Sequence, residues 1–149
     1  MSPSTPADRA DGVIRTATAA DADALFELAR QLATSFRPQR EAFEQCLCEV
    51  AEDPSAWLAV AERDGTVLGY CLGFDHVTFY ANGRVAWVEE IVVRPEWRRS
   101  RLGARLMTAF EDWARSRGAR LVALATRRAA PFYTALGYEE SAVYFRKLL

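Results

Sequence analysis

One stretch of the chain, residues 85–107, constrains the fold more than any other. It opens with an apolar run over about residues 85–93, which is typical of a buried strand because β-branched side chains fit a pleated, buried surface. Pro95 ends this strand, since proline has no N–H to donate to a ladder. After a basic turn the chain enters a helix whose apolar residues fall on one face: Leu102, Leu106, Phe110, Trp113 and Ala114. The sequence therefore predicts a strand, a turn and an amphipathic helix in direct succession.

The junction between this strand and this helix is suited to bind an anion. The first turn of a helix has unpaired backbone N–H groups and the positive end of the helix dipole. Arg98, Arg99 and Arg101 add formal positive charge to the turn, so a pyrophosphate or a phosphate ester is the natural occupant. The chain contains neither G-x-x-x-x-G-K-[ST] nor G-x-G-x-x-G, which excludes P-loop and Rossmann sites.

Two motifs make the chain resemble the GCN5-related N-acetyltransferases. The family signature, V-x-P-x-x-[QR]-x-x-G-x-[GA], lies between a strand and a helix and corresponds here to residues 93–103. Gly103 keeps the second signature glycine, whereas Arg101 stands in the place of the first. A second family element, A-x-x-F-Y-x-x-x-G-[YF], matches residues 129–138 in full. The two motifs follow in the right order, roughly 30 residues apart, as a strand between two helices requires.

The resemblance implies an α/β (α+β) fold, with a mixed, mostly antiparallel sheet flanked by helices on both faces. The expected order of elements is β-α-α-β-β-β-α-β-α-β. Residues 1–12 are expected to form a mobile polar tail, and residues 13–149 a single N-acetyltransferase domain. The predicted strands cover residues 13–17, 57–62, 66–74, about 85–93, 121–125 and 143–149, with a loop over residues 76–84.

Composition limits the classes of function. A formal net charge of −1 gives no general reason to expect nucleic-acid binding, and arginines concentrated between Arg94 and Arg105 suit a compact anion better. No apolar run reaches membrane-spanning length. Cys46, Cys48 and Cys71 are odd in number and lack paired C-x-x-C spacing, so neither a disulfide framework nor a zinc site is indicated. We therefore expect a cytoplasmic protein that has three reduced thiols and no metal.

The resemblance also implies how acetyl-CoA is held. In the family, the sheet splays open between the 85–93 strand and the strand after the long helix, and the pantetheine arm lies in that gap. By resemblance, backbone groups of Ile91, Val92 and Val93 pair with this arm. The pyrophosphate is surrounded by the turn and the first helical residues, which are Arg98, Arg99, Ser100, Arg101, Leu102, Gly103 and Ala104. Thr126 stands where family members often have Asn. We expect Arg101 to keep ordinary helical angles, and so to reshape or weaken the phosphate site without closing it.

Moving an acetyl group from a thioester to an amine requires a neutral amine, a donor for the developing oxyanion and a proton source for the departing thiolate. The resemblance gives Tyr133 the role of the acid, because the Tyr of the family's F-Y pair points at the thioester sulfur. The alternative is that Phe132 and Tyr133 only pack the short helix.

Glu89 and Glu90 are the candidates for the base. Two acids inside an apolar strand are unusual, because a buried carboxylate is costly unless it is paired or its pKa moves. Adjacent strand residues face opposite sides, so only one of the two should face the substrate. Similarity to the small-amine acetyltransferases of the family favours Glu89, with Glu90 in reserve. The alternative is that one of them pairs with an arginine and has no chemical role.

The sequence thus predicts an acetyl-CoA-dependent N-acetyltransferase that acts directly on a primary amine of a small molecule or a peptide. The rival from another class is a CoA-binding regulatory module that keeps the fold and has little turnover. Arg101 favours this rival, whereas the intact Tyr133 and Glu89 oppose it. No nucleic acid or membrane is expected as a partner, and a homodimer, which is common in the family, stays open.

Overall fold

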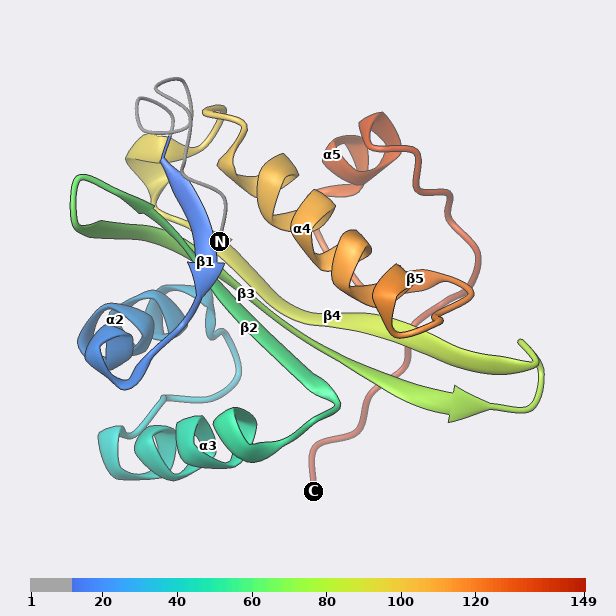
Figure 1. Ribbon diagram of the computed structural model, residues 1–149, viewed down its shortest axis with the longest axis horizontal. Coiled ribbons are helices and arrows are strands. Elements are labelled where there is room, and N and C mark those ends of the chain that lie inside the picture. Colours follow the sequence, from blue (N-terminus) through green and yellow to red (C-terminus); the bar gives the residue numbers. More distant parts are fainter. Residues whose placement is uncertain (1–11) are drawn as a thin grey trace.

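The structure, a computed structural model, describes residues 12–149, which are arranged around one five-stranded sheet (Figure 1). The strands are β1 (Val13–Thr16), β2 (Ala56–Arg63), β3 (Thr66–Thr78), β4 (Gly83–Val93) and β5 (Val122–Leu124). The helices are η1 (Ala19–Asp21), α2 (Ala22–Leu32), α3 (Arg40–Glu52), η2 (Pro95–Trp97), α4 (Leu102–Ser116) and α5 (Ala130–Ala135). The spatial order is β1-β2-β3-β4-β5, antiparallel except for the parallel pair β4 and β5. Residues 1–11 of the predicted polar tail lie outside the described residues.

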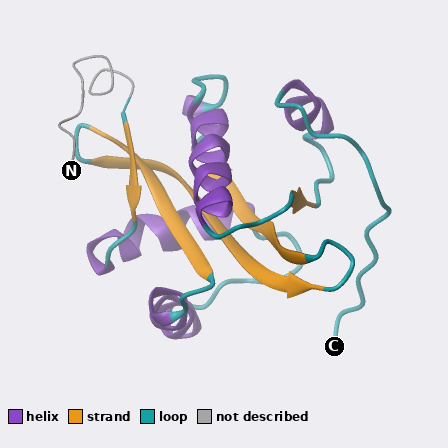
Figure 2. Cartoon of the chain, turned by 45° about the vertical axis from the view of Figure 1, so that its right-hand side comes forward, coloured by secondary structure: helices purple, strands orange, loops and turns teal. Residues whose placement is uncertain are grey.

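Helices cover both faces of the sheet, as predicted. On one face, Leu25 and Leu28 of α2 pack in a core cluster with Tyr70 of β3. On the other face, Phe110 of α4 packs in a second cluster that includes Val88 of β4. Figures 1 and 2 show α2 and α3 on one side of the strands and α4 and α5 on the other. The predicted fold class is therefore confirmed.

Two predictions about single segments are wrong. Residues 76–84 are not a loop, because β3 runs to Thr78 and β4 begins at Gly83, so that only a short turn joins them. The predicted last strand, residues 143–149, does not form and has no ladder partner among the described residues. Its side chains suit a strand, but a strand also needs a neighbour that completes its backbone hydrogen bonds. Local sequence does not report whether such a neighbour is in place.

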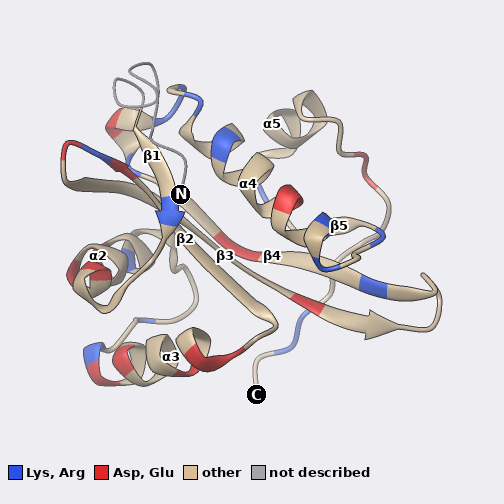
Figure 3. Ribbon diagram, in the orientation of Figure 1, with Lys and Arg blue, Asp and Glu red and all other residues tan. Residues whose placement is uncertain are grey.

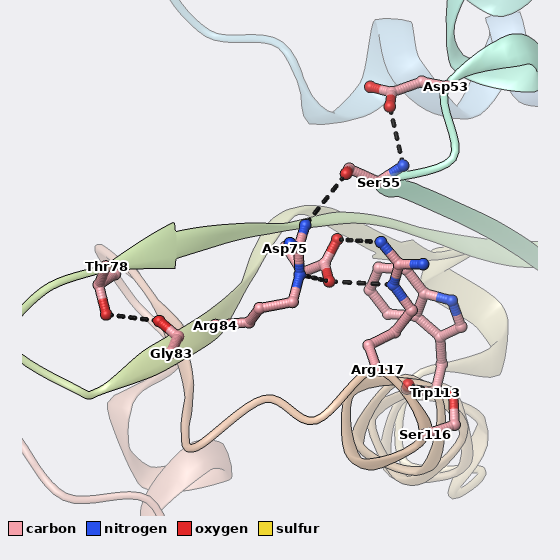
Figure 4. Close-up of polar contacts among 9 residues, drawn as sticks. All are labelled: Asp53, Ser55, Asp75, Thr78, Gly83, Arg84, Trp113, Ser116 and Arg117. Carbon is pink, nitrogen blue, oxygen red and sulfur yellow. Dashed lines mark hydrogen bonds and ion pairs between the residues drawn. The ribbon is translucent and has the colours of Figure 1, made fainter.

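A buried cluster of charges fixes the β3–β4 hairpin to the C-terminal end of α4 (Figure 4). The Asp75 side chain is 0% exposed and accepts hydrogen bonds from Arg84 Nε at 2.6 Å and from Arg117 Nε at 3.0 Å. Arg84 also donates to Ser55 Oγ at 3.3 Å, and the Arg117 guanidinium lies 5.7 Å from the ring centre of Trp113. Burial opposes ionisation of Asp75, but the hydrogen bonds from both arginines outweigh it and lower the pKa of this carboxyl. The cluster thus stays charged at neutral pH and holds one end of α4 in place.

Strand β4 carries a β-bulge in its middle. Glu90 pairs with Leu72 of β3, and Val88 pairs with the next β3 residue, Gly73. Glu89 is therefore an extra residue without a partner in the β3–β4 ladder. A bulge breaks the regular alternation of side chains along a strand, so the faces of Glu89 and Glu90 do not follow from counting residues.

Gly73 allows α4 to pack tightly over this bulged part of the ladder. A Cβ atom added at Gly73 would lie 2.3 Å from the Phe110 ring and 2.7 Å from the carbonyl oxygen of Trp87. Phe110 is fully buried and contacts the rings of Trp57 and Trp113, with centroids 5.5 Å away in each case. The ring therefore has no free space into which it can move, and the position requires glycine.

We expect Gly73→Ala to lower the free energy of unfolding by about 2–3 kcal/mol, because the added methyl group overpacks a filled core. The matched variant is Gly103→Ala, whose Cβ would lie 3.2 Å from the half-exposed Phe132 ring. Since alanine also favours the helix, Gly103→Ala should change stability by less than about 1 kcal/mol. Urea denaturation followed by circular dichroism measures both values. Equal losses in the two variants would contradict the packing argument.

Candidate active site

The sheet is open between β4 and β5 over part of its length. The parallel ladder joins Ala86 to Val122, Trp87 to Ala123 and Val88 to Leu124, and Val88 is the last β4 residue in it. Residues 90–93 of β4 remain paired with β3, but within residues 12–149 residues 89–93 have no strand partner on the β5 side. Every second backbone N–H and C=O of this segment faces that open edge. The two strands therefore leave a wedge between them beyond Val88, and the free backbone groups of β4 line it; we call this gap the wedge.

The three residues predicted to offer backbone groups to a ligand lie along this wedge. Val92 is buried in the core under α2, whereas Ile91 and Val93 are half-buried and pack into the core under α4. Their side chains are therefore anchored on both faces of the sheet. This anchoring leaves the backbone edge as the part of the segment that can bind.

The basic turn lies at the N-terminal end of α4, and Figure 3 shows its charged ribbon beside that end of the helix. The side chains of Arg98, Arg99 and Arg101 are exposed and form no ion pair within residues 12–149. The Ser100 hydroxyl donates to the carbonyl oxygen of Trp97 and so closes the turn locally. Three unpaired cations beside a helix N-terminus make this end of the molecule locally positive.

Backbone N–H groups at the start of α4 add hydrogen-bond donors to this positively charged turn. The first helical hydrogen bond that starts from the turn runs from Arg105 N–H to the Arg101 carbonyl at 2.9 Å. The N–H groups of Leu102, Gly103 and Ala104 come before it, so they have no acceptor within the helix. The predicted pyrophosphate residues are thus brought together in one turn.

The backbone of Arg101 differs from the prediction. Its φ is +68° and ψ is 0°, in the left-handed region, and Arg99 has a φ of +71°. The expectation of ordinary helical angles at Arg101 is therefore wrong. The chain must turn sharply between η2 and α4, and this path fixes a conformation that glycine adopts without strain. A left-handed conformation costs a non-glycine residue about 1–2 kcal/mol, so the turn keeps the shape of a glycine turn at the expense of stability.

The two acids of β4 occupy different environments. Glu89, at the bulge, is exposed and has no hydrogen bond or ion pair within the described residues. Glu90 is half-buried and accepts a hydrogen bond of 2.6 Å from the Tyr70 hydroxyl. Burial, together with the charge of Glu90, raises the pKa of Tyr70, which keeps it a hydrogen-bond donor. Neither acid pairs with an arginine in the described part of the chain. No motif in the sequence predicted Tyr70 as a partner of Glu90.

Tyr133 of α5 lies in the core cluster that includes Phe110 of α4. It is 8% exposed and packs edge-on against Phe132 and Tyr138, with ring centroids 4.9 and 5.9 Å away. Burial raises the pKa of Tyr133, so the phenol stays protonated at neutral pH. Within residues 12–149 its hydroxyl has no hydrogen-bond partner, and no fully buried side-chain oxygen there is left unsatisfied. The hydroxyl therefore reaches solvent.

The remaining candidates have simpler surroundings. The Thr126 hydroxyl oxygen accepts a hydrogen bond of 3.1 Å from the Ala129 N–H, just before α5, and its own proton stays available. Burial raises the pKa of the Cys71 thiol to about 12, and Cys46 and Cys48 are exposed and free. Within residues 12–149, no group of three or more His, Cys, Asp or Glu side chains is placed to hold a metal ion. In that same part of the chain, each helix is too short or too polar to cross a membrane.

Comparison with known proteins agrees with this geometry. The family model for the Acetyltransferase (GNAT) family matches residues 22–138. The chain is 31% identical to the aminoalkylphosphonate N-acetyltransferase of Salmonella typhimurium over 91% of its length and 90% of that protein. It is 32% identical to the aminoglycoside N(6′)-acetyltransferase type 1 of Stenotrophomonas maltophilia over 89% of its length and 91% of that protein.

A solved structure has the same fold at lower identity. The aminoglycoside N-acetyltransferase AAC(6′)-Iy in complex with CoA superposes with a TM-score of 0.79 at 22% identity, covering 91% of this chain and 93% of that one. The chain therefore belongs to the GNAT family of acetyltransferases and is a GNAT-type acyltransferase.

The strain at Arg101 can be measured by comparing two glycine variants that remove the same charge. Arg101→Gly should raise the free energy of unfolding by roughly 0.5–1 kcal/mol, because relief of the left-handed strain exceeds the entropy that glycine adds to the unfolded chain. Arg98 has a φ of −63°, so Arg98→Gly adds only that entropy. It should lower stability by about 0.5–1 kcal/mol. Urea denaturation at high salt measures the pair, and a change of the same sign in both would contradict the argument.

Proposed function

We propose that this chain is an acetyl-CoA-dependent N-acetyltransferase that moves an acetyl group directly to a primary amine of a small molecule or a peptide. The observation that carries the proposal is the wedge between β4 and β5. The β5 ladder stops at Val88, the bulge at Glu89 follows at once, and the free backbone edge leads to the basic turn before α4. A long ligand with an amide-rich arm and a phosphate end matches both parts of this surface.

The proposed binding of acetyl-CoA uses backbone more than side chains. Residues 91–93 offer N–H and C=O groups of the open β4 edge to the pantetheine arm. The pyrophosphate is bound by the first N–H groups of α4 and by the guanidinium groups of Arg98, Arg99 and Arg101. The left-handed backbone of Arg101 supports this proposal, because the turn has the shape that a glycine would give it. The Thr126 hydroxyl is in place to donate one further hydrogen bond.

Glu89 is the residue that we propose as the base. It is exposed, it is free of protein partners within residues 12–149, and it lies where β4 leaves β5. An ammonium group has no lone pair, so a carboxylate at the mouth of the wedge can accept its proton directly or through water. Glu90 is the reserve, although its hydrogen bond to Tyr70 favours a positioning role.

Tyr133 is the residue that we propose as the acid. Its raised pKa keeps a proton on the hydroxyl, and this hydroxyl is free of protein acceptors within residues 12–149. When the amine attacks the thioester carbonyl and the C–S bond breaks, the departing thiolate takes up a proton. Tyr133 belongs to the core cluster against which Ile91 packs, and this supports a position near the open edge of β4. Cys71, whose buried thiol has a pKa of about 12, is a poor nucleophile, which supports transfer without an acyl-enzyme.

Two of the relatives guide the proposal for the acceptor. One is named for an aminoalkylphosphonate and the other for an aminoglycoside, and both names describe small molecules with primary amines. We therefore propose a small-molecule amine before a peptide. We also propose a cytoplasmic location, which the three free cysteines support, since disulfides are rare in that compartment.

Calorimetric titration with acetyl-CoA, followed by an assay of CoA thiol release with an aminoalkylphosphonate and an aminoglycoside, tests this function. We expect wild type to bind acetyl-CoA and to release thiol with at least one primary amine. Tyr133→Phe should bind acetyl-CoA equally well but turn over at least tenfold more slowly. Tyr138→Phe is the control, because that hydroxyl donates to Glu111 at 2.6 Å, and its turnover should stay near wild type.

Each alternative outcome has a separate meaning. Tight binding without thiol release for any amine would favour the CoA-binding regulatory module. Equal rates for Tyr133→Phe and wild type across the pH range would remove Tyr133 as the acid.

The roles of the two glutamates separate in their pH dependence. Glu89→Gln should lower turnover by about ten- to hundredfold, with the largest loss at low pH, where free amine is scarce. Glu90→Gln should keep most of the rate and instead lower thermal stability, because it weakens the hydrogen bond from Tyr70. Initial rates and melting curves of both variants measure the contrast. A rate loss confined to Glu90→Gln would show that the assignment of the two residues is reversed.

A further inference from the structure

Two large aromatic side chains of the β3–β4 hairpin, Phe74 and Trp87, belong to neither core cluster. Both are half-buried, and the two residues pair directly across the antiparallel ladder. Within residues 12–149, no other aromatic ring and no cation stacks on either of them. Aromatic surface that the fold leaves out of its cores is surface that a ligand can cover.

Both rings point to the face of the sheet that carries α2 and α3. The neighbours of Phe74 along β3, on either side, face α4. The neighbours of Trp87 along β4, on either side, belong to the core cluster that includes α4. Because successive side chains of a strand point to opposite faces, the two rings face away from α4.

The packed cluster under α2 ends before it reaches the rings. On β3 this cluster extends to Leu72, and Figure 1 shows the hairpin continuing past α2 and α3. The neighbours of the rings in the adjoining strands are small, with Ala56 of β2 beside Phe74 and Ala123 of β5 beside Trp87. These four paired residues, two alanines flanking two rings, form what we call the aromatic row. Its rings are large side chains between small ones.

The aromatic row adjoins the opening of the wedge. Trp87 is part of the β4–β5 ladder, and the next pair, at Val88, is the last before the two strands separate. A ligand that lies on the row is therefore beside the point where the open edge of β4 begins. This is the edge that we propose to hold the acetyl-bearing arm of acetyl-CoA.

The charge next to the row is negative. Glu90 lies on the same face as the rings, because it accepts a hydrogen bond from Tyr70 of the α2-side cluster, and the exposed Glu89 precedes it. On β3, the partner of Glu90 is two residues from Phe74, a distance of about 7 Å along a strand. Residues 70–76 and 85–92 include no Lys or Arg. An ammonium group is therefore favoured at this end of the row, and an anion is disfavoured.

The surroundings of the row suit an aromatic body better than a sugar or a phosphonate. The hydroxyl groups of a sugar lose water on binding and then need new hydrogen bonds. The side chains that surround such a body, Leu72, Phe74 and Trp87, are apolar and provide none. A phosphonate would lie beside carboxylates without a cation to pair with. A planar apolar ring meets neither obstacle and gains contact with both aromatic side chains.

We propose that the acceptor is an arylalkylamine, a primary amine joined by a short alkyl link to an aromatic ring, and that this ring lies on the aromatic row. The proposal rests on the acetyl transfer proposed above and names its acceptor class. The neutral amine attacks the acetyl carbon and the C–S bond breaks. The proton that the nitrogen then loses balances the one that the thiolate takes up, so the products are an N-acetyl amide and CoA. Phe74 and Trp87 determine specificity and take no part in proton transfer.

Initial rates of thiol release with phenethylamine and with butylamine test the acceptor class. For wild type, kcat/KM should be at least about tenfold higher with phenethylamine, since butylamine has no ring to bury. Trp87→Leu and Phe74→Leu should each raise the KM for phenethylamine by about five- to tenfold and leave its kcat within about twofold. Their kinetics with butylamine should match wild type, which also shows that the variants fold.

The matched control is Phe79→Leu, which removes a ring that is 99% exposed at the tip of the same hairpin. It should be indistinguishable from wild type with both amines. The proposal is overturned if wild type uses butylamine as well as phenethylamine, or if the two leucine variants at the row raise KM equally for both amines.

A binding measurement separates this proposal from the proposed chemistry. In the complex with CoA, which has no acetyl group to transfer, phenethylamine should shift the Trp87 indole N–H signal in a proton–nitrogen NMR spectrum. The signal is assigned by its loss in Trp87→Leu, and butylamine at the same concentration should leave it in place. A shift without thiol release from acetyl-CoA would support the aromatic site and remove acetyl transfer. Thiol release with amines but no shift would support acetyl transfer and overturn the aromatic site.

Discussion

The two edges of strand β4 differ in how far their backbone hydrogen bonds are satisfied by neighbouring strands. On the β3 side the ladder continues past the bulge to Val93, whereas on the β5 side it ends at Val88. A buried backbone group without a partner costs about 1–3 kcal/mol, so residues 89–93 are stable only where water or a ligand takes the place of the missing strand. This requirement locates the site. The free edge leads directly to the turn where α4 begins, so a ligand that pairs with it is guided toward the positive end of that helix.

The wedge depends on contacts that hold α4 at three points along its length. At its C-terminal end, Arg117 is bound to Asp75. In its middle, the Phe110 ring packs against Gly73, beside the bulge. At its N-terminal end, the position of a Cβ at Gly103 is 3.2 Å from the Phe132 ring and 4.0 Å from Val93 Cγ2. Since the helix is fixed at each point, its first N–H groups have a defined direction. The charged cluster around Asp75 lies at the opposite end of α4 from the proposed phosphate site. It nevertheless helps to orient the N–H groups of that site, because it fixes the position of the helix.

Much of this arrangement could be predicted because its signals are local. The apolar run before Pro95, the arginines after it and the helical spacing from Leu102 indicate the strand, the turn and the helix. The bulge could not be predicted in this way, because it is a mismatch between two strands and is visible only in their register. For the same reason, counting alternate residues could not assign the faces of Glu89 and Glu90. The hydrogen bond from Tyr70 to Glu90 joins residues far apart in the sequence, and no motif reports it.

Two errors of prediction, at Arg101 and at the last strand, have a common physical origin. At Arg101 the local preference is against the left-handed region, but η2 and α4 fix the path of the chain on either side, and the preference is overruled. At residues 143–149 the local preference for a strand is strong, but no neighbouring strand within residues 12–149 completes it. Local propensity therefore reports what a segment favours, and non-local partners decide what it adopts. In the first case the flanking elements prevail over the local preference, whereas in the second the preference is not met within residues 12–149.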